Sequence, residues 1–373
     1  MNVPIGVQTG PVGGYTSMAP GVRKAQRPTM KDVARLAGVS VQTVSVVVNE
    51  KAVVTPVTRD RILAAIDELG YRPLAVGRSL RTGSTRTIGL MVADITNPFF
   101  ARMADAVEDY AHRAGYNLIL YNTHSDPERE RTYLQIATQR WVDGMLFVTT
   151  TDTLHGLGSL RKAGIPVVAI DRIPDHYDGP SVILDNRKTG AMVAEHLLDL
   201  GHERLAHICG PLDLRLSVER LESFQGAIRA RGLEPLPHVV GDVAWSAESG
   251  YAAMHELLAR APSPTAVFAS NDRLAIGAMR AAVESGLRVP EDISFVGVDN
   301  IELSPYQTPP LTTVRQRLTD VATLATKILL DLLEGQEPAE AHVVFEPELI
   351  VRQSTARPPR LPTAQKEVLA RPS

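Results

Sequence analysis

The chain has 373 residues, of which 44% are hydrophobic, and it carries a formal net charge of −3 at pH 7. This length predicts two or three domains, and the absence of an apolar run of about 18 residues argues against a membrane span. The single cysteine, Cys209, excludes an intramolecular disulfide, and the N-terminus lacks the pattern of a secretory signal, so we expect a cytoplasmic protein.

Charge is distributed unevenly along the chain. Residues 1–86 hold 12 Lys and Arg against five Asp and Glu, a net +7, whereas the remaining residues hold 27 against 37, a net −10. A basic N-terminal part on an acidic remainder predicts a polyanionic partner for the N-terminal part alone. The alternative is a chance cluster of solvated charges without such a partner.

The two ends of the chain differ in composition from its middle. Residues 1–28 contain five glycines, four prolines and no acidic residue, which predicts a disordered arm. Residues 355–373 are also rich in proline and predict a disordered tail. Between these ends we expect a compact head over 29–72, a linker over 73–86 and a large body over 87–354.

The head carries the signals of three short helices. Thr29 is placed to cap a first helix and Ser40 a second, with Gly38 at the turn between them. A third helix begins after Thr55 and ends at Gly70. Two helices joined by a short turn and braced by a third form a helix-turn-helix. The spacing of apolar residues predicts a shared core of Met30, Val33, Ala34, Ala37, Val39, Val44, Val47, Val48, Ile62, Ala65, Ile66 and Leu69.

The second helix of a helix-turn-helix lies in the major groove of DNA, so its outward face reads the bases. That face carries Val41, Gln42 and Val46. The Gln42 amide suits adenine, and the valines suit thymine methyl groups. The alternative, a three-helix packing unit without DNA function, leaves the apolar Val46 on the outward face unexplained. The groups better suited to phosphate oxygens are Thr43, Ser45, Asn49, Thr58 and the backbone near Ser40. Thr29, at the start of the first helix, completes the predicted set of DNA-binding residues.

The body alternates between apolar runs typical of strands and longer segments with helical spacing. This rhythm predicts parallel sheets covered by helices on both faces, and about 270 residues call for two such lobes. Ligands bind such folds beyond the carboxyl ends of the strands. The expected strands are 88–92, 118–121, 145–148, 166–170, 181–184, 205–209, 266–269 and 294–298.

An ordered series of motifs resembles the lactose-repressor (LacI/GalR) family of bacterial transcription regulators. The resemblance implies a homodimer whose two heads read a pseudo-palindromic operator in double-stranded DNA. It also implies a body like the periplasmic sugar-binding proteins, in which the chain crosses between the lobes three times. The expected fold is therefore a three-helix helix-turn-helix head on an α/β body of two parallel-sheet lobes. The motifs are Asp32–Ser45, Val48-Asn49, Leu69–Pro73, Asn271–Gly277, Pro290–Ser294, Val296–Asp299 and Pro309–Val314.

The linker resembles the hinge helix of this family over residues 74–80. In relatives this helix drives a leucine into the minor groove at the central base step, and Leu80 matches that leucine. The alternative for Leu80 is a packing role in the linker. Val46 departs from the family, since many relatives carry a polar reader there, and Gly77 stands where alanine is usual. A glycine costs about 1 kcal/mol in a helix interior, so we expect a hinge helix that orders less readily.

The resemblance also implies an effector cleft in the body. Carboxylates, an amide and a guanidinium around an aromatic floor suit a polyol, because each hydroxyl both donates and accepts. Three structural alternatives stay open: Asp272 as a helix cap, a pairing of Asp94 with Arg172, and a purely structural role for Arg220 together with Asp299. The effector-binding residues that the family positions imply are Asp94, Asn97, Phe99, Asp171, Arg172, Arg220, Phe224, Asn271 and Asp299.

We therefore expect a repressor of a sugar-utilisation operon that a small carbohydrate releases, located in the bacterial cytoplasm and at the nucleoid when bound to DNA. The alternative is a co-repressor-dependent regulator that responds to a purine, a nucleoside or a phosphosugar. A solute receptor without DNA function would suit the body but not the basic head.

The sequence lacks common enzyme motifs, which argues against catalysis. The chain has neither a GxxxxGK[ST] phosphate loop nor a G-x-S-x-G elbow. His202 and His207 do not have the spacing that places two zinc ligands on one face of a helix. We expect no catalytic residue, no metal and no cofactor.

Overall fold

The computed structural model of the chain describes residues 28–48, 54–72, 83–152, 156–241, 245–260 and 263–359. The chain divides into two units, residues 1–82 and residues 83–373. The head lies in the first unit and the body in the second.

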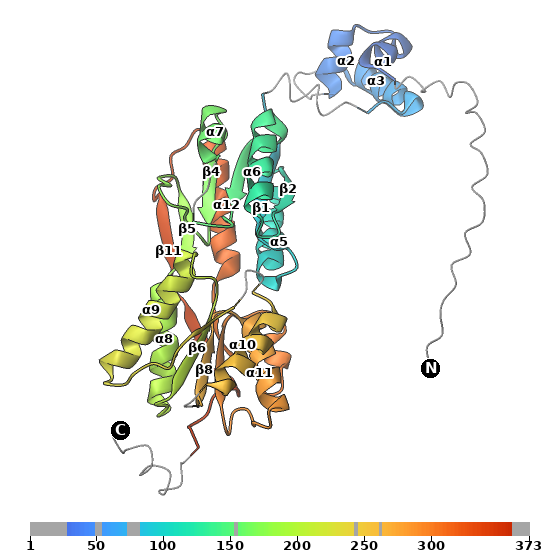
Figure 1. Ribbon diagram of the computed structural model, residues 1–373. Helices are drawn as coiled ribbons and strands as arrows, with labels where there is room; N and C mark the ends of the chain where they lie inside the picture. The colour runs from blue at the N-terminus through green and yellow to red at the C-terminus, as the bar shows by residue number, and fades with distance from the viewer. Residues whose placement is uncertain are drawn as a thin grey trace, which may run out of the picture. The chain divides into compact units, whose positions relative to one another are not determined.

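Three helices form the head: α1 Met30–Ala37, α2 Val41–Val48 and α3 Pro56–Leu69 (Figure 1). Gly38 and Gly70 end α1 and α3 with left-handed φ angles of 62° and 59°, a conformation that glycine adopts without steric cost. The predicted helix-turn-helix is thereby confirmed. The buried cluster at its centre consists of Val33, Ala34, Ala37, Val44, Val47, Ile62, Ala65 and Tyr71.

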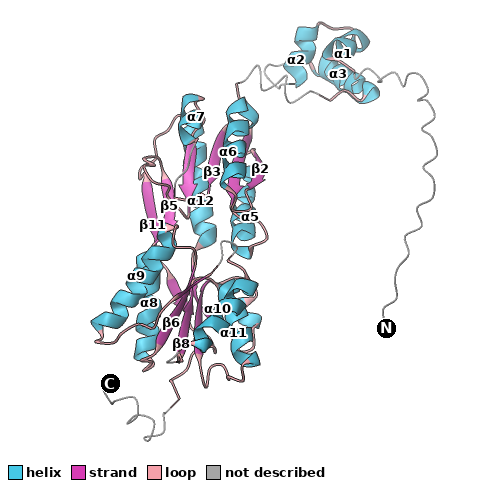
Figure 2. Cartoon of the chain, in the orientation of Figure 1, coloured by secondary structure: helices cyan, strands magenta, loops and turns pink. Residues whose placement is uncertain are grey.

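The first lobe of the body is built on a parallel six-stranded sheet in the order β11-β5-β4-β3-β1-β2. Its strands are β1 Thr87–Val92, β2 Asn117–Asn122, β3 Gly144–Phe147, β4 Val167–Ile170, β5 Ser181–Leu184 and β11 His342–Phe345. Its helices are α5 Pro98–Arg113, α6 Pro127–Ile136, the π-helical turn η1 Ala137–Trp141, α7 Leu157–Lys162 and α12 Leu318–Leu333. Helices α5 and α12 cover one face of the sheet, and α6 and α7 cover the other (Figure 2).

The second lobe has a six-stranded sheet in the order β12-β10-β9-β8-β6-β7, in which only β12 runs antiparallel to its neighbour β10. Its strands are β6 Leu205–Cys209, β7 Val239–Val240, β8 Ala266–Ala269, β9 Ser294–Asp299, β10 Thr312–Arg315 and β12 Glu348–Ile350. Its helices are α8 Asn186–Asp199, α9 Arg215–Ala230, α10 Ala247–Ala259, α11 Asp272–Glu284 and the 3-10 turn η2 Ser304–Tyr306. Helices α8 and α9 pack on one face, and α10 and α11 on the other.

The chain passes between the lobes three times: from β5 to α8, from β10 to α12 and from β11 to β12. All eight expected strands are present. Four further strands, β7, β10, β11 and β12, did not stand out in the sequence. Strands β11 and β12 lie at sheet edges and are half exposed, so they lack the continuous apolar run of a buried strand.

The C-terminal boundary differs from the expected one. The tail was expected to be disordered from residue 355, but Thr355 contacts His196 Nε2 at 3.1 Å and the Ala356 N–H donates to Ser294 Oγ at 3.0 Å. These bonds extend the ordered body beyond residue 354. No helix in the described part of the chain is long and apolar enough to cross a membrane.

Candidate DNA-reading face and effector cavity

Hydrogen bonds between residues three positions apart fix the starts of the three helices of the head. Ser40 Oγ accepts from the Thr43 N–H at 3.0 Å at the start of α2. At the start of α1, the Thr29 N–H donates to Asp32 Oδ2 at 2.9 Å. Thr58 donates from its N–H to Thr55 Oγ1 at 3.4 Å at the start of α3. Each bond fixes the start of a helix, and the predicted phosphate-binding residues lie at or near these starts.

The face of α2 that turns away from the core carries the predicted base readers. Val41 and Gln42 are exposed, while Ser45 and Val46 are partly buried without belonging to the central cluster. Thr43 and Thr58 are also partly buried, whereas Thr29 and Ser40 are exposed. Asn49, Leu80 and the expected hinge helix with Gly77 lie outside the described residues.

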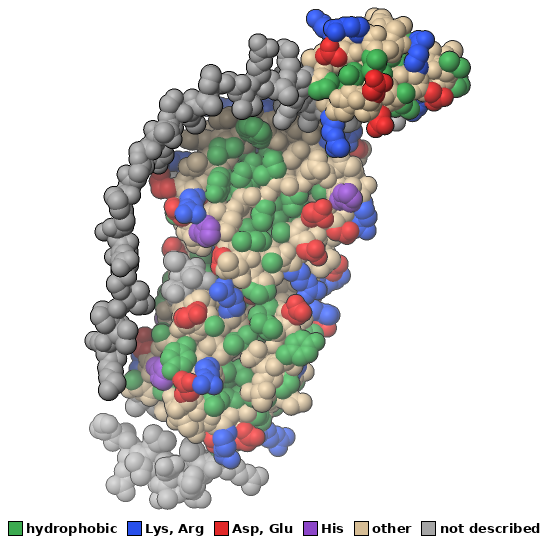
Figure 3. All heavy atoms as spheres, turned by 90° about the vertical axis from the view of Figure 1, so that its right-hand side faces the viewer, with side chains coloured by type: hydrophobic (Ala, Val, Ile, Leu, Met, Phe, Trp, Pro, Cys, Tyr) green, Lys and Arg blue, Asp and Glu red, His purple; other side chains and the backbone are tan. Residues whose placement is uncertain are grey.

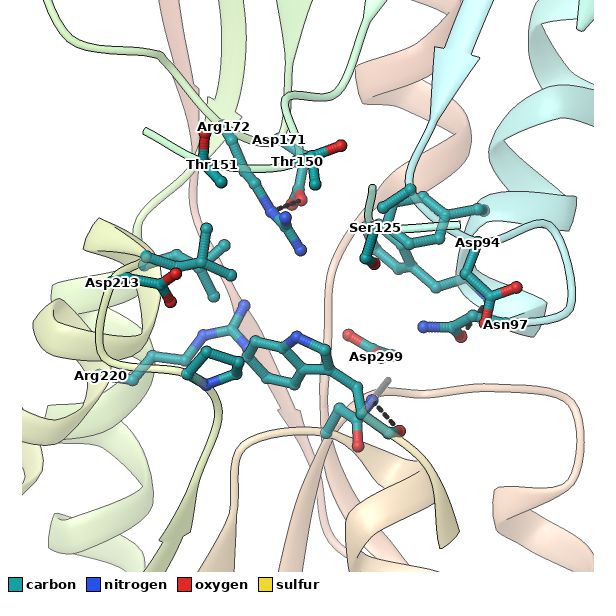
Figure 4. Close-up of a pocket in the computed structure, with 18 of the residues that line it drawn as sticks. Asp94, Asn97, Ser125, Thr150, Thr151, Asp171, Arg172, Asp213, Arg220 and Asp299 are labelled. Atoms are coloured by element: carbon teal, nitrogen blue, oxygen red, sulfur yellow. Dashed lines mark hydrogen bonds and ion pairs between the residues drawn. The ribbon is translucent and has the colours of Figure 1, made fainter. Parts of the chain in front are cut away.

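A cavity of about 280 Å³ lies between the two lobes of the body. Its lining residues follow the carboxyl ends of strands from both sheets, which is where loops of parallel α/β lobes converge. Charged side chains point into it from both lobes (Figure 4). Eight of the nine expected effector residues line it, namely Asp94, Asn97, Phe99, Asp171, Arg172, Arg220, Asn271 and Asp299.

On the first lobe, the residues after β3 and β4 form one wall. Arg172 donates from Nη1 to the Thr149 carbonyl oxygen at 3.0 Å, and its Nε lies 3.5 Å from Asp171 Oδ2. That buried Nε has no hydrogen-bond partner in the described structure. Glu130 of α6 accepts from the Thr150 N–H at 2.6 Å and fixes the loop after β3. This wall therefore offers a buried cation with an unused donor.

The loop after β1 belongs to the first lobe and forms an ion pair with the second. Asp94 accepts from the Thr96 N–H at 2.9 Å and forms an ion pair with Arg273 of the second lobe at 3.5 Å. The alternative pairing of Asp94 with Arg172 is thus wrong, since Arg172 pairs with Asp171. Asp94 is held at the edge of the cavity by partners from both lobes.

On the second lobe, hydrogen bonds lock the polar side chains in place. Arg220 of α9 donates from Nε to Asn186 Oδ1 at 2.8 Å and from Nη1 to the Ser270 carbonyl oxygen at 2.7 Å. Gln316 donates from Nε2 to Asp299 Oδ1 at 2.9 Å, and its buried Oε1 has no partner in the described part of the chain. These bonds fix the side chains of this wall in place.

Asn271 and Trp245 form the base of the cavity on the second lobe. Asn271 caps α11 by accepting from the Leu274 N–H at 2.8 Å, and its Nδ2 donates to the Trp245 carbonyl oxygen at 3.3 Å. The Trp245 indole comes within 2.1 Å of where a Cβ on Gly210 would stand, so a side chain there would displace the indole. The Trp245 indole can therefore take this position only because residue 210 is a glycine.

Asp272 does not cap α11, which was one of the structural alternatives for this residue. The cap is Asn271, and Asp272 lies buried behind it. Its Oδ2 accepts from the Ile301 N–H at 2.9 Å, and its Oδ1 accepts from Thr313 Oγ1 at 2.5 Å. Burial raises its pKa to about 6. Asp272 therefore ties α11 to the loop after β9 and supports the cavity from behind.

Burial shifts the acid–base properties of the cavity. It raises the pKa of Asp171, a shift that the charges of Arg172 and Arg220 oppose. Burial, assisted by the negative charge of Asp272, raises the pKa of Asp299 well above its usual range. Burial also lowers the pKa of Arg172 and of Arg220. Shifted groups of both signs gathered in one cavity are typical of a functional site.

Backbone strain is concentrated in the same place. Of the nine non-glycine residues with positive φ in the described ranges, four line the cavity: Ser125, Asp171, Trp245 and Asp299. Such conformations cost about 1–3 kcal/mol each and persist where the surrounding structure imposes them. The strain supports the assignment of this cavity as the functional site of the body.

Phe224 does not lie where the resemblance implied. It is buried in the core of the second lobe, with its ring centroid 5.4 Å from that of His207 and 5.2 Å from that of Phe268. It is not among the lining residues, and Trp245 supplies the aromatic surface on that side. Phe224 therefore supports the wall from within, because α9 turns it toward the sheet.

Several residues that line the cavity are not among the predicted ones, namely Ser125, Thr150, Thr151, Asp213, Trp245 and Gln316. The first four follow expected strands, so the rule that ligands bind at carboxyl ends of strands would have found them. Gln316 follows β10, which was not expected, and Trp245 precedes α10 in a loop without any strand signal.

The chain is similar to proteins of known family. Residues 29–73 match the family model of bacterial regulatory proteins of the lacI family, and residues 194–355 match a periplasmic binding protein-like domain. The HTH-type transcriptional repressor PurR of Vibrio atlanticus (strain LGP32) is 37% identical over 328 residues, which are 87% of this chain and 98% of the relative. The chain belongs to the lacI family of bacterial regulatory proteins.

Solved structures of this family agree with the assignment. The Lac repressor dimer bound to operator and the anti-inducer ONPF is 31% identical, with a TM-score of 0.81 over 89% of this chain and all of that one. The regulator CelR in complex with cellobiose is 33% identical, with a TM-score of 0.67 over 88% of this chain and all of that one. As a member of the lacI family, this protein is a DNA-binding transcriptional repressor rather than an enzyme.

Proposed function

We propose that a small neutral carbohydrate binds the cavity and releases the repressor from its operator. The observation that carries this proposal is the mixture of acceptors and donors on facing walls. A sugar hydroxyl both donates and accepts, so each one can bridge a carboxylate and a nitrogen donor. The carboxyl groups are Asp94, Asp171, Asp213 and Asp299, the nitrogen donors are Arg172, Arg220 and Asn271, and Gln316 Oε1 is a further acceptor.

Charge and size restrict the ligand further. Four carboxyl groups line the cavity, and both guanidinium groups already donate to protein oxygens, so the lining suits a neutral polyol better than a phosphate. A volume of about 280 Å³ is at the small end for ligand pockets and suits one or two sugar rings. The relative CelR, whose solved complex holds cellobiose, supports the carbohydrate class.

A purine or nucleoside acting as co-repressor is the second candidate, and similarity to the repressors named PurR favours it. The cavity has aromatic walls from both lobes, Phe99 and Phe100 on one side and Trp245 on the other. A planar base needs such surfaces, but it uses fewer carboxylates than this cavity offers. A binding panel that contains both classes separates the two candidates.

We also propose that the protein acts as a homodimer. Strand β2 lies at the edge of its sheet and exposes Leu120, α11 exposes Val283, and the loop at η2 exposes Leu303 and Tyr306. The side of the body that carries β2 and α11 faces the viewer in Figure 3, and hydrophobic side chains are spread over both lobes there. An interface between two copies of the chain would cover this exposed apolar surface. Two heads held together would read the two halves of a pseudo-palindrome.

Release from DNA follows from linkage between two sites. A ligand that binds the DNA-free state more tightly lowers operator affinity, and operator must lower ligand affinity by the same factor. Calorimetric titration of the ligand with and without saturating operator checks this reciprocity. Equal affinities in the two titrations would contradict the proposed mechanism.

The first experiment selects binding sites from random duplex DNA with the purified full-length protein. We expect enrichment of a symmetric site with two half-sites, and the operon beside its genomic match indicates the ligand. Thermal-shift measurements then test neutral mono- and disaccharides, sugar phosphates, adenine and guanosine. Stabilisation by a sugar supports the proposal, and stabilisation by a purine compound alone overturns it.

Arg220→Ala tests the site itself. We expect the ligand shift to vanish and ligand affinity to fall about 10–100-fold, because a buried charged hydrogen-bond donor is lost. Operator binding should persist. Arg229→Ala is the matched control, since the exposed Arg229 stands on the same helix and, among the described residues, its side chain donates to Gln225. Loss of operator binding in Arg220→Ala would instead assign Arg220 to the structure of the body.

A further inference from the structure

Asp143 receives an unusual concentration of hydrogen bonds from three consecutive residues. Its Oδ1 accepts from the Thr85 N–H at 2.7 Å and from Thr85 Oγ1 at 2.9 Å. Its Oδ2 accepts from Ser84 Oγ at 2.5 Å and from the Arg86 N–H at 2.8 Å. The four bonds fill the lone pairs of the carboxylate. None of the cavity residues takes part in them.

The backbone of this segment is fixed from the other side as well. The Asp143 N–H donates to the Thr87 carbonyl oxygen at 2.7 Å, and the Asn117 N–H donates to the Arg86 carbonyl oxygen at 2.9 Å. Arg86 has a φ of 51°, and its guanidinium lies 5.1 Å from the centroid of the Tyr116 ring. A non-glycine residue keeps such a φ only where its surroundings impose it. The segment is therefore held in one conformation.

This clamp stands at a defined place in the chain. Residues 84–86 are the last before β1 and the last of the linker expected over 73–86, and they belong to the same unit as the body. Asp143 is the last residue before β3. The clamp therefore joins the beginnings of two neighbouring strands, and it holds the point at which the linker leaves the body.

The same two strands lead to the cavity. Strands β1 and β3 are parallel and paired, with Ile88 opposite Gly144 and Met91 opposite Phe147. At their carboxyl ends, the loop after β1 carries Asp94 and the loop after β3 carries Thr150, both of which line the cavity. One pair of rigid strands thus has the ligand site at one end and the linker at the other.

We propose that Asp143 is a positioning residue for operator recognition. Its carboxylate fixes the origin of the linker on the body, and through β1 and β3 it ties that origin to the residues around the ligand. Two heads find both half-sites of an operator only if their linkers start from fixed points, whereas contact with any stretch of duplex has no such requirement. Asp143 therefore sets the preference for operator over other DNA.

Asp143→Asn in the full-length protein tests this role. The side chain keeps its size, but its amide turns N–H groups toward N–H and O–H donors. We expect operator affinity to fall about tenfold, since charged hydrogen bonds are lost, while affinity for a scrambled duplex stays within about twofold. Hydrogen exchange should show faster exchange of the Thr85 and Arg86 amides. Asp109→Asn is the matched control, because Asp109 forms an exposed ion pair with Arg113 in the same lobe.

The proposal rests on the proposed operator, and the wild-type protein separates the two. Failure of the wild type to enrich a duplex counts against the operator, whereas an unchanged ratio of operator to scrambled affinity in Asp143→Asn overturns the role of Asp143. A purely structural role would lower the melting temperature and leave that ratio intact. If Asp143→Asn does not fold, the double variant Ser84→Ala and Thr85→Val removes the two hydroxyl donors. It must lower the ratio in the same direction, and an unchanged ratio there is equally decisive against the proposal.

Discussion

The head and the body fix their functional residues by different means. In the head the bonds around the reading helix are local: Thr29 with Asp32, Ser40 with Thr43 and Thr55 with Thr58 are each three residues apart. In the body, Arg220 takes partners 34 and 50 residues away, and the ion pair of Asp94 with Arg273 spans 179 residues. A reading face needs only correctly placed helices, whereas the cavity exists only when both lobes are folded.

The two regions also differ in how much core supports them. A single small cluster, centred on Val33, Val44 and Ile62, supports the head, whereas four clusters support the body. A domain as small as the head seldom has more than about 3–5 kcal/mol of net stability. The head should therefore fail before the body, and each should be breakable without the other.

Ile62→Ala should break the head alone, and its effect on DNA binding should be the largest of any single substitution in the two regions. Ile62 is completely buried among the three helices, and a buried isoleucine-to-alanine change costs about 2–5 kcal/mol. We expect loss of all DNA binding, with an unchanged melting transition of the body. Calorimetry and binding to a labelled duplex measure the two effects. Leu63→Ala, at a 47% exposed neighbour on α3, should change the stability of the head by no more than about 0.5 kcal/mol.

His202→Gln should remove a pH-dependent part of the stability of the body that the head does not have. Burial lowers the pKa of His202 to about 4, below its ordinary value of 6.5, so the folded body disfavours the charged imidazole. Its contribution to stability is present above pH 6.5 and is lost as the pH falls toward 4, about 3 kcal/mol in all. The head has no histidine in residues 28–72 and is not subject to this loss.

The measurement is the free energy of unfolding of the body by urea at pH 7 and at pH 4.5. The difference between wild type and His202→Gln should shrink at the lower pH. His112→Gln is a suitable control, because His112 lies exposed at the end of α5. An equal difference at both pH values would mean that His202 acts only through packing.

What the sequence could predict follows the same division. The helix caps, the glycine turns and nearly all of the head's core could be predicted, because neighbouring residues decide them. Tyr71 joins that core from beyond α3, and no periodic pattern marks it. The buried strands of the body were equally visible as apolar runs.

The cavity could be predicted only in part. Residues directly after a recognisable strand, such as Asp171 and Asn271, could be placed at its edge. Gln316 could not, since its strand, β10, has no continuous apolar run. Nor could the inward turn of Phe224, because which face of α9 meets the sheet is set by residues far away in the chain. Local signals fix elements, and long-range packing decides which side chains reach the ligand.

Gln42→Ala should have the smallest effect on affinity and the most specific one. Gln42 is exposed at the start of α2 and makes no contact with the core, so its loss should leave the head folded. If its amide pairs with a base, affinity falls by about 1–3 kcal/mol for the preferred operator, and the preference at one base pair of each half-site disappears. Thr43→Val provides the contrast, because a lost phosphate contact weakens binding to all sequences alike. Repeating the selection of random duplexes with both variants measures this. An unchanged base preference in Gln42→Ala would move the reading role to Val41 and Val46, and would show that apolar contacts alone select the operator.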